Sequence, residues 1–515
     1  MSDTLGMPDE PTGDEFRADP AFPEQDEPDT AAPRRAVTAK GVAVASARTV
    51  AGLVGIGVAA VTIAAAVLIP LPTIGSTPQG MTVVPVPTAQ QLVCAGSVLR
   101  LADDTGEGAT TVSALGTPQV RAASSDGQVS MNPVETSDAS TGTTSSAPTI
   151  VSTPPSPDAT QSALVSAAQS ELVEEGDFVG LAAADCDSAN GDSWLAGGST
   201  AVGRTTLLSL TNPSEVAATV NLELFGEDGA ITAPGTSGII VPANGQRVLS
   251  LAGFQPGIAS PVVHVTSTGG QVSARLQEAI VRGLEPGGVD IVSSVPELST
   301  STVIPGVVVT DLDAVQALRK GGDPQFDDVE TAIRVFAPGE GSVSVTVSVR
   351  PEDAADTGTS FTLDIDAGRV TDIPVQQLAT GNYTVTLESE APLVASARVT
   401  SAVGARTDFA WFSSASLLTE SAQVTAAPGP NTLLHLANPT TTEARVVVAA
   451  RGGASTTVTV PAGASGLLEL DSGTTYSLSG FTALYASVSL AEDGMIAGYD
   501  VTPPGVGSAP IVVFP

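Results

Sequence analysis

Residues 205–229 read TTLLSLTNPSEVAATVNLELFGEDG, and this stretch decides the fold class. Apolar and small polar side chains alternate on both sides of Asn212-Pro213, and a period of two is typical of half-buried β-strands. Two related stretches follow, TAIRVFAPGEGSVSVTVSVRPED at 331–353 and NTLLHLANPTTTEARVVVAARGG at 431–453. The chain therefore carries a β-rich repeat.

Each repeat continues with two further pairs of alternating segments. We interpret every pair as a hairpin, and the first turns are Asn212-Pro213, Ala337-Pro338 and Asn438-Pro439. About six strands in roughly 75 to 90 residues fit an immunoglobulin-like β-sandwich. Asp290 and Asp408 precede apolar segments that are either seventh strands or structured linkers. The fold class is thus mainly β, with tandem immunoglobulin-like sandwich repeats packed in a rod or in a compact pseudo-threefold assembly.

Residues 49–72, TVAGLVGIGVAAVTIAAAVLIPLP, carry no charge and are long enough to cross a hydrocarbon layer as a helix. Basic residues from Arg34 to Arg48 precede this segment, whereas the next basic residue after it is Arg100. The positive-inside rule therefore predicts a single-pass cell-membrane protein with a cytoplasmic N-terminus and an extracellular C-terminal domain. A cleaved signal peptide and a buried core helix are the alternatives.

Composition shifts along the chain predict its other divisions. Residues 161–174, QSALVSAAQSELVE, place Leu164, Ala168 and Leu172 four apart, which favours a short amphipathic helix. Residues 311–328 break the β pattern and indicate a short helix or an exposed insertion. The predicted divisions are a disordered acidic cytoplasmic tail with a basic end (1–48), the transmembrane helix (49–72), a membrane-proximal β segment (73–105), a Ser/Thr/Pro-rich linker (106–160), a short helix and connector (161–194), repeat 1 (195–300), a connector (301–328), repeat 2 (329–415) and repeat 3 (416–515).

The two cysteines, Cys94 and Cys186, both follow the predicted span. A disulfide between them is the favoured interpretation outside the cell, and free, buried or intermolecularly paired thiols are the alternatives. The bridge would close a loop of about 90 residues, which the loop-entropy treatment values at roughly 4 kcal/mol. Neither cysteine has the spacing of a zinc or redox motif.

Few residues suggest chemistry. His264 and His435 lie in alternating segments of different repeats, so we expect structural strand residues and no shared catalytic role. Trp194 and Trp411 fit a core or interdomain contact better than a sugar-stacking platform. The acidic stretches 183–192 and 311–328 lack the calcium-loop pattern and fit solvated loops. We expect no catalytic, cofactor-binding or metal-binding residues and no cofactor.

The anchor, LVCAGSVLRL at 92–101, the block at 197–229 and STVIPG at 301–306 give the chain a wider resemblance. It resembles an uncharacterised family of actinobacterial membrane-anchored large exoproteins that contain a domain of unknown function. The resemblance covers nearly the whole chain from the anchor onward and implies no catalytic residues. The segment after Cys94, Ala95-Gly96, departs from the Pro-rich turn of that family.

A formal net charge of −35 argues against nucleic acid as a partner, because such binding needs clustered Lys and Arg. The predicted function is a non-enzymatic envelope binding or scaffolding protein whose partner is an unidentified envelope protein or glycan. The alternative is a signalling or assembly subunit that couples the outer domain to a cytoplasmic partner through the acidic tail. The oligomeric state is not indicated by the sequence.

Overall fold

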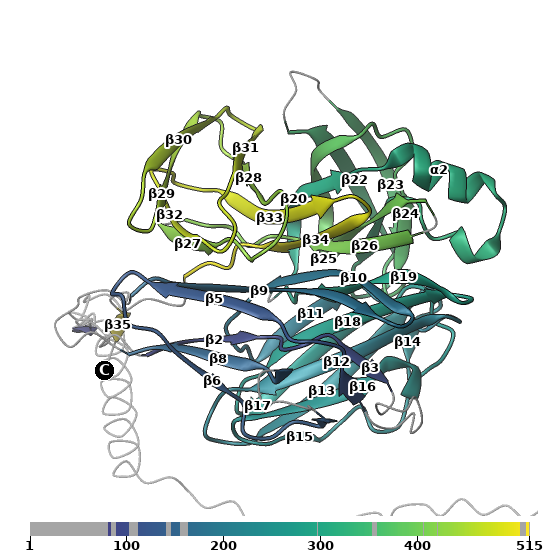
Figure 1. The fold of residues 1–515 in the computed structure, drawn as a ribbon, viewed down its shortest axis with the longest axis horizontal. Helices are drawn as coiled ribbons and strands as arrows, with labels where there is room; N and C mark the ends of the chain where they lie inside the picture. The colour runs from purple at the N-terminus through teal and green to yellow at the C-terminus, as the bar shows by residue number, and fades with distance from the viewer. Residues whose placement is uncertain are drawn as a thin grey trace, which may run out of the picture. The chain divides into compact units, whose positions relative to one another are not determined.

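β-Strands form nearly all of the regular structure, so the mainly β prediction is confirmed (Figure 1). This computed structural model describes residues 81–83, 89–101, 112–140, 146–154, 163–295, 297–352, 358–404, 406–419, 421–504 and 511–513. The predicted acidic tail and transmembrane helix lie outside these ranges. Within them, no helix has the length and apolarity needed to cross a membrane. β1 (Met81–Val83) and β35 (Ile511–Val513) form a small separate sheet.

Residues 192–292, called module II, show the arrangement of strands most completely. One sheet has the order β11-β17-β13, with β14 and β15 both paired to β13, and the other has the order β16-β12-β18-β19. Leu208 and Leu210 of one sheet share a buried core with Val220 and Leu222 of the other. The elements are β11 (Asp192–Ala196), β12 (Arg204–Asn212), β13 (Ala218–Gly226), β14 (Gly229–Ile231), β15 (Ile239–Val241), β16 (Gly245–Ser250), η2 (Leu251–Gly253), β17 (Val262–Gly269), β18 (Ser273–Arg282) and β19 (Glu285–Val292).

Modules III (299–413) and IV (422–500) repeat this order. Module IV has the sheets β27-β32-β29-β30 and β31-β28-β33-β34, and in module III the 23-residue strand β25 runs through both sheets. The strands are β20 (Ser299–Val309), β21 (Ala332–Phe336), β22 (Ser342–Pro351), β23 (Thr359–Asp366), β24 (Thr371–Pro374), β25 (Gly381–Val403), β26 (Arg406–Ser413), β27 (Ala422–Thr425), β28 (Leu433–Ala437), β29 (Ala444–Ala450), β30 (Ser455–Val460), β31 (Ser465–Glu469), β32 (Thr475–Ser479), β33 (Tyr485–Glu492) and β34 (Met495–Asp500).

A further module, module I (90–185), precedes the three that the sequence indicated. One sheet of module I, β2-β8-β6, corresponds to the first, sixth and third strands of the other modules. The other sheet, β5-β9-β10, corresponds to their second, seventh and last strands. A small sheet, β3-β4-β7, is added to it. The strands are β2 (Gln90–Cys94), β3 (Leu99–Leu101), β4 (Val112–Ala114), β5 (Gln119–Ser124), β6 (Ser130–Pro133), β7 (Ala139–Ser140), β8 (Thr149–Thr153), β9 (Val165–Glu175) and β10 (Phe178–Asp185).

Module I corrects two predictions. The described parts of the predicted linker 106–160 form strands β4 to β8, because short Ser- and Thr-rich segments gain backbone pairing from their neighbours. The predicted helix is strand β9, which lies between β5 and β10. Leu172 is 52% exposed while its neighbour Val173 is buried, so side chains alternate across a sheet instead of following one helical face.

The hairpins predicted at the first turns are also wrong, whereas the third pair of repeat 3 is a hairpin, because β33 pairs with β34. β12 and β13 flank Asn212-Pro213 but lie in opposite sheets, and the same holds for β21 and β22 and for β28 and β29. The Asn212 amide donates to the carbonyl of Val216 (2.8 Å), and its side-chain oxygen accepts from the N–H of Ser214 (3.0 Å). Asn438 makes the equivalent bonds to Thr442 and Thr440. The asparagine thus holds an arch that carries the chain from one sheet to the other.

The connector between modules II and III is shorter than predicted, because β20 within it is the first strand of module III. The remainder contains helix α2 (Leu312–Lys320) and η3 (Pro324–Phe326), so a short helix is confirmed there. The segments after Asp290 and Asp408 belong to strands β19 and β26.

In an immunoglobulin constant domain the first two strands are neighbours, whereas here the first strand pairs with the sixth. The immunoglobulin-like class is therefore not confirmed.

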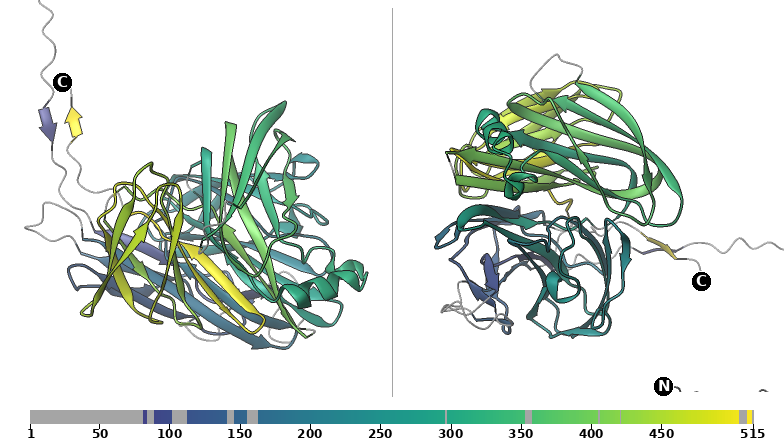
Figure 2. Two further views of the ribbon diagram at one scale, coloured as in Figure 1. Left: turned by 90° about the horizontal axis from the view of Figure 1, so that it is seen from above. Right: turned by 90° about the vertical axis from the view of Figure 1, so that its right-hand side faces the viewer.

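The four modules form a closed cycle around their last strands. β10 contacts β19, β19 contacts β26, β26 contacts β34, and β34 contacts β10. In the right-hand view of Figure 2, modules I and II lie on one side and modules III and IV on the other. Both faces of these last strands are covered, one by the module's own core and one by neighbouring modules. This arrangement explains why β10, β19, β26 and β34 consist mainly of buried residues.

Asp408 of β26 lies at the centre of this cycle. Its carboxylate accepts backbone N–H groups from Leu181 of β10 (2.9 Å), Val289 of β19 (3.3 Å) and Ile496 of β34 (3.1 Å). A Cβ added to Gly180 or Gly288 would lie 2.5 or 2.7 Å from Asp408 Oδ1, so glycine at both positions allows this close approach. One carboxylate therefore joins all four modules.

Buried arginines hold modules II and III together. Asp328 pairs with Arg204 (2.7 Å), Arg282 (2.5 Å) and Arg398 (3.4 Å). Although burial raises the pKa of Asp328, these three charges lower it to about 2. Arg334 donates to the carbonyl oxygen of Gly198 (2.7 Å) across the same junction. The junction is therefore an ordered polar contact and not a flexible linker.

Candidate functional site

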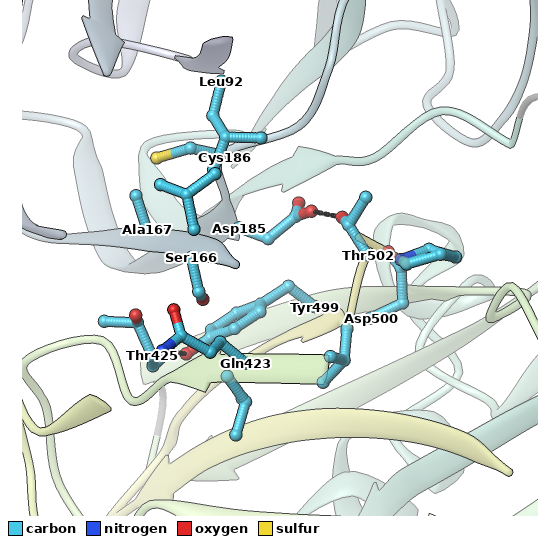
Figure 3. A pocket seen from close by; sticks show the side chains of 14 residues that line it. Leu92, Ser166, Ala167, Asp185, Cys186, Gln423, Thr425, Tyr499, Asp500 and Thr502 are labelled. Atoms are coloured by element: carbon cyan, nitrogen blue, oxygen red, sulfur yellow. Dashed lines mark hydrogen bonds between the residues drawn. The ribbon is translucent and has the colours of Figure 1, made fainter. Parts of the chain in front are cut away.

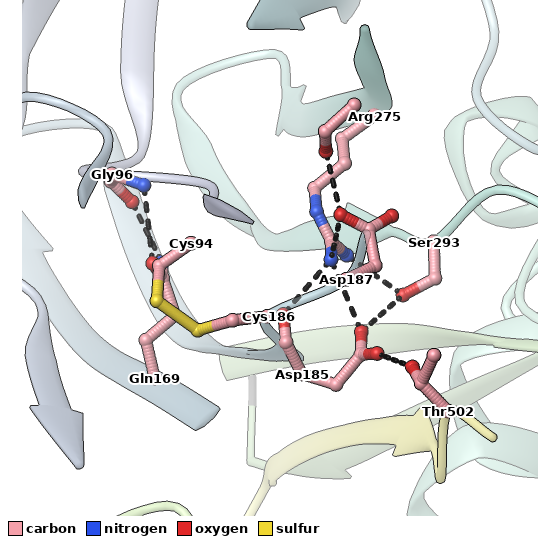
Figure 4. The surroundings of a disulfide bond; sticks show 10 residues. Cys94, Gly96, Gln169, Asp185, Cys186, Asp187, Arg275, Ser293 and Thr502 are labelled. Atoms are coloured by element: carbon pink, nitrogen blue, oxygen red, sulfur yellow. Dashed lines mark hydrogen bonds and ion pairs between the residues drawn. A yellow bond between two sulfur atoms is a disulfide. The ribbon is translucent and has the colours of Figure 1, made fainter. Parts of the chain in front are cut away.

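A further cluster of buried polar groups is built around Asp185, Cys186 and Asp187. β10 ends at Asp185, and alternation directs the two aspartates to one side and Cys186 to the other. Cys186 forms a disulfide with Cys94 at the end of β2 (S–S 2.03 Å), so the predicted bridge is present (Figure 4). Val93 N donates to the carbonyl of Asp187 (2.7 Å) beside it. The bridge thus joins the first and last strands of module I and fixes both aspartates.

Arg275 of β18 lies between the two aspartates. Its Nη2 is 3.2 Å from Oδ1 of Asp185 and 3.2 Å from Oδ1 of Asp187, and its Nη1 donates to Ser293 (2.9 Å). The side chain is only 2% exposed. Although burial lowers the pKa of Arg275, the charges of Asp187 and Asp185 raise it above its usual value. The guanidinium is therefore a permanent charge at the contact between modules I and II.

Module IV completes the cluster through the end of β34. Thr502 donates a short hydrogen bond to the carboxylate of Asp185 (Figure 3). Asp500 is nearly buried, and burial together with the charge of Asp185 raises its pKa well above the usual range. Burial also raises the pKa of Asp187 to about 6, against the opposing effect of Arg275. The cluster of Asp185, Asp187, Arg275, Ser293, Asp500 and Thr502 is called the Asp185 cluster below.

Two hollows adjoin the Asp185 cluster. The one in Figure 3 lies between Leu92, Gln423, Tyr499 and Asp500 and has a volume of about 20 Å³, which is too small for an organic ligand. A wider hollow of about 750 Å³ opens beside it, with Asp187, Asn190 and Ser294 in its wall. Among the described residues, no group of His, Cys, Asp or Glu is arranged to hold a metal ion.

The Asp185 cluster is arranged to join modules I, II and IV. The carboxylates of Asp185 and Asp187 are held by side chains from other modules, as Asp187 is by the hydroxyl of Ser273 (2.6 Å). A general base needs a carboxylate that is within reach of a substrate proton. Here the same oxygens are engaged in structural bonds, so the chemistry that the geometry supports best is binding of one module to the next.

His264 lies on strand β17 of module II, and 14% of its side chain is exposed. Its Nδ1 is 2.8 Å from Glu223 and its Nε2 is 3.0 Å from Asp192, both on neighbouring strands. Its ring stacks on Trp194, with centroids 3.9 Å apart. Trp194 is 7% exposed and shares a cluster with Phe336 of module III, so it lies at the predicted interdomain contact.

His435 lies in a buried triad of residues between modules III and IV. Nε2 is 2.7 Å from Ser489 Oγ, and Nδ1 is 2.6 Å from Glu352 Oε2. This order is that of a hydrolase triad. Ser489 is 1% exposed, however, and Glu352 also accepts from the N–H of Gly306 (2.9 Å) and the hydroxyl of Thr384 (2.7 Å). The three side chains therefore form a junction that a substrate does not reach.

The remaining predicted candidates have structural positions as well. Trp411 packs in the core of module II and donates from Nε1 to Glu278 (2.8 Å), below the guanidinium of Arg334. In the acidic stretch 311–328, Asp311 accepts from Ser401 (2.6 Å) and Asp323 caps η3. The two histidines lie in different modules, and neither contacts the other's partners.

Sequence reasoning missed Arg275, Glu352 and the role of Asp408. All three lie in or beside alternating strands, where a charged residue is expected to face solvent. A signal was present for Asp408, because Asp290 and Asp408 were noted before apolar segments. Asp290 does make a related bond, since its Oδ2 accepts from the N–H of Trp411 (2.7 Å).

Comparisons with known proteins add one firm result. A search among curated proteins finds no match. Among solved structures, the chain is similar to "Biofilm associated protein - BSP domain" at 9% identity and a TM-score of 0.11, covering 67% of this chain and 64% of that one. A family model matches residues 139–471, and the chain therefore belongs to the family of unknown function DUF5719.

Proposed function

We propose that this protein is a non-enzymatic cell-envelope protein that binds or scaffolds other envelope components. Residues 49–72 anchor it in the membrane, as the resemblance to membrane-anchored exoproteins implies, and the basic residues before this segment predict a cytoplasmic N-terminus. The disulfide between Cys94 and Cys186 supports an oxidising compartment for the body of the protein. The partner is an envelope protein or a glycan.

One observation carries this proposal: the buried polar groups of the body hold the four modules together. The Asp185 cluster, Asp408, Asp328 with its arginines, and the His435–Glu352 pair each connect different modules. A body of this kind keeps its outer strands in fixed positions. Edge strand β30 of module IV, for example, exposes Thr457 and Thr459. Rigid exposed edges suit binding better than catalysis.

In-cell crosslinking tests the proposal. A photo-crosslinking residue at Thr459 of the full-length chain should capture a defined envelope protein or wall glycan on intact cells. The matched control carries the same residue at Val448, which is buried in module IV and should capture nothing from outside the chain. Capture of cytoplasmic proteins from Thr459 would overturn the topology.

Deletion of residues 1–33 separates scaffolding from signalling. If the protein is a scaffold, the shortened chain should still reach the surface and yield the same crosslinks and the same cell phenotype. Loss of the phenotype with normal surface display and unchanged crosslinks would instead favour the alternative, a subunit that signals through its acidic tail.

A further inference from the structure

A groove of about 870 Å³ lies between modules III and IV. One wall is the outward face of the sheet formed by β20, β25 and β22, including Ser348 and Thr386. The other wall consists of module IV residues around Pro439, Gly463 and Tyr485. This volume falls within the range of small-molecule and oligomer sites, roughly 300–1,000 Å³. It is called the III–IV groove below.

The walls of the III–IV groove are fixed relative to one another. Thr384 Oγ1 lies 2.8 Å from Ser465 Oγ, and Nη1 of Arg350 donates to the carbonyl of Gly463 (3.1 Å). Below them, Glu352 joins Thr384 to the buried His435. A ligand in the groove would not have to order these residues, so little conformational entropy would be lost on binding.

Hydroxyl groups follow regular rows across the outward face of the module III sheet, and Ser348, Thr386 and Glu388 of these rows line the groove. Ser360, Ser348 and Thr386 are directly opposite one another on β23, β22 and β25, and Thr362, Thr346 and Glu388 form the next row. Hydroxyl pairs within these rows are 2.9 Å apart at Thr346–Thr362 and at Ser348–Ser360. Neighbouring strands are spaced by roughly 4.8 Å, so the face offers donors and acceptors at short regular intervals.

The groove also contains an aromatic ring beside a carboxylate. Ser301 donates to Oε1 of Glu388 (2.7 Å). Burial and the charge of Glu388 raise the pKa of Tyr485 above its usual value. A half-buried tyrosine offers an apolar ring face and a polar tip.

These features favour one class of ligand. Rows of hydroxyls, a carboxylate acceptor and a tyrosine ring match the alternating hydroxyl and C–H surfaces of a sugar chain. Glu388 and the net charge of −35 disfavour an anionic ligand, and Arg350, the cation in the groove wall, already donates to the carbonyl of Gly463. A peptide that binds as an added strand would need an unpaired strand edge, whereas this wall of the groove is the face of a sheet.

We propose that the III–IV groove binds a neutral polyhydroxylated chain, that is, an oligosaccharide. This inference rests on the proposed binding function and assigns it a site and a ligand class. The ligand lies along the hydroxyl rows of module III and packs a sugar face on Tyr485.

Titration of the full-length protein with soluble hexasaccharides tests the proposal. The probes are the neutral hexamers of glucose, mannose and N-acetylglucosamine, with a hexamer of galacturonic acid as the charged comparison. At least one neutral hexamer should bind with millimolar or tighter affinity, and the acidic hexamer should bind at least tenfold more weakly. Absence of binding by all three neutral hexamers, or preference for the acidic one, would overturn the proposal.

Variants locate the binding. Two variants should each lower the affinity for the best-bound hexamer at least tenfold without a change in the thermal unfolding midpoint. One is Tyr485→Ala, and the other combines Ser348→Ala with Thr386→Val. Thr232→Val removes an exposed threonine hydroxyl of module II, outside the groove, and should leave affinity unchanged. Equal affinity of the groove variants and wild type would place binding elsewhere and contradict the proposal.

The two proposals can fail separately. If crosslinking from Thr459 captures an envelope protein while no neutral hexamer binds, the groove assignment is wrong and the scaffold stands. If the neutral hexamer binds in the groove but no envelope component is captured in cells, the sugar site stands and the scaffold does not.

Discussion

Asp408 shows how a single buried side chain can organise four modules. Its carboxylate accepts N–H groups from three other modules and is fully buried. Burial raises its pKa to about 7, despite the opposing effect of these hydrogen bonds. The carboxylate therefore titrates close to neutral pH in the folded protein.

Replacement of Asp408 by Asn should change the pH dependence of stability. A carboxyl whose pKa rises on folding adds most to the free energy of unfolding at pH values below its unfolded pKa of 3.8. This stabilisation is lost as pH rises toward 7. The advantage of wild type over Asp408→Asn should thus shrink by about 3 kcal/mol between pH 4 and pH 7. Urea unfolding of both proteins at four pH values measures this difference, and parallel profiles would contradict it.

Replacement of His435 by Gln should destabilise the junction between modules III and IV. Although burial raises the pKa of Glu352, the charge of His435 and its hydrogen bond lower it. Without the imidazole, the buried Glu352 carboxylate loses its side-chain partner from module IV, and breaking a buried pair in this way costs about 3–5 kcal/mol. Urea unfolding at pH 7 measures the loss.

The pH profile and a second histidine provide the controls for this substitution. Because its pKa is lowered on folding, Glu352 stabilises the folded protein at pH values above its ordinary pKa of 4.5. This stabilisation is lost as pH falls through the pKa of the folded state. The deficit of His435→Gln should therefore become smaller in acid. His264→Gln removes a histidine whose two carboxylate partners are 58% and 67% exposed, and it should cost under about 1 kcal/mol. Equal losses in the two variants would refute the assignment.

At the scale of elements, the disulfide connects β2 to the end of β10 and positions the Asp185 cluster. The cysteines are 92 residues apart, and removal of such a bridge is expected to cost about 2–5 kcal/mol. The double variant Cys94→Ala, Cys186→Ala should therefore unfold at a lower temperature than oxidised wild type. Reductant should lower the midpoint of wild type toward that of the variant and should not affect the variant itself. A midpoint that is insensitive to reductant would indicate that the bridge contributes nothing.

Strand prediction succeeded where alternation was strong and failed where partners had to be assigned. The alternation in β12 and β13 identified both strands, but it reports only that one face is buried. It carries no information about which strand lies alongside. The predicted hairpins at Asn212-Pro213 and Asn438-Pro439 were therefore wrong, although the strands themselves are confirmed.

Buried charges were missed for a related reason. On β18, Ser273, Arg275 and Gln277 lie on the face opposite Ala274 and Leu276, which belong to the module core. The sequence predicts that such a face is exposed to solvent. In the structure it packs on module I, where Gln277 accepts from the N–H of Leu99 (3.0 Å). Only the arrangement of the modules turns this polar face into an interface, so the Asp185 cluster could not be predicted from one strand.

At the scale of the whole molecule, the negative net charge of the chain opposes the close packing of the four modules. A net charge of −35 favours expansion of the chain by self-repulsion. Only 20 residues are Lys or Arg, and four arginines, Arg275, Arg282, Arg334 and Arg398, are buried at contacts between modules. Placing cations there neutralises aspartates and glutamates where modules meet, and the surface retains the remaining negative charge.

Because the four modules form a closed cycle, we expect them to unfold together. The last strand of each module is covered by those of its neighbours, so loss of one module would expose the buried faces of two others and leave the Asp408 carboxylate unpaired. Calorimetry of the full-length protein should therefore show one main transition whose van't Hoff and calorimetric enthalpies agree. Asp408→Asn should shift that transition as a whole without splitting it. Independent modules on a string would instead give several transitions, with only that of module III sensitive to the substitution.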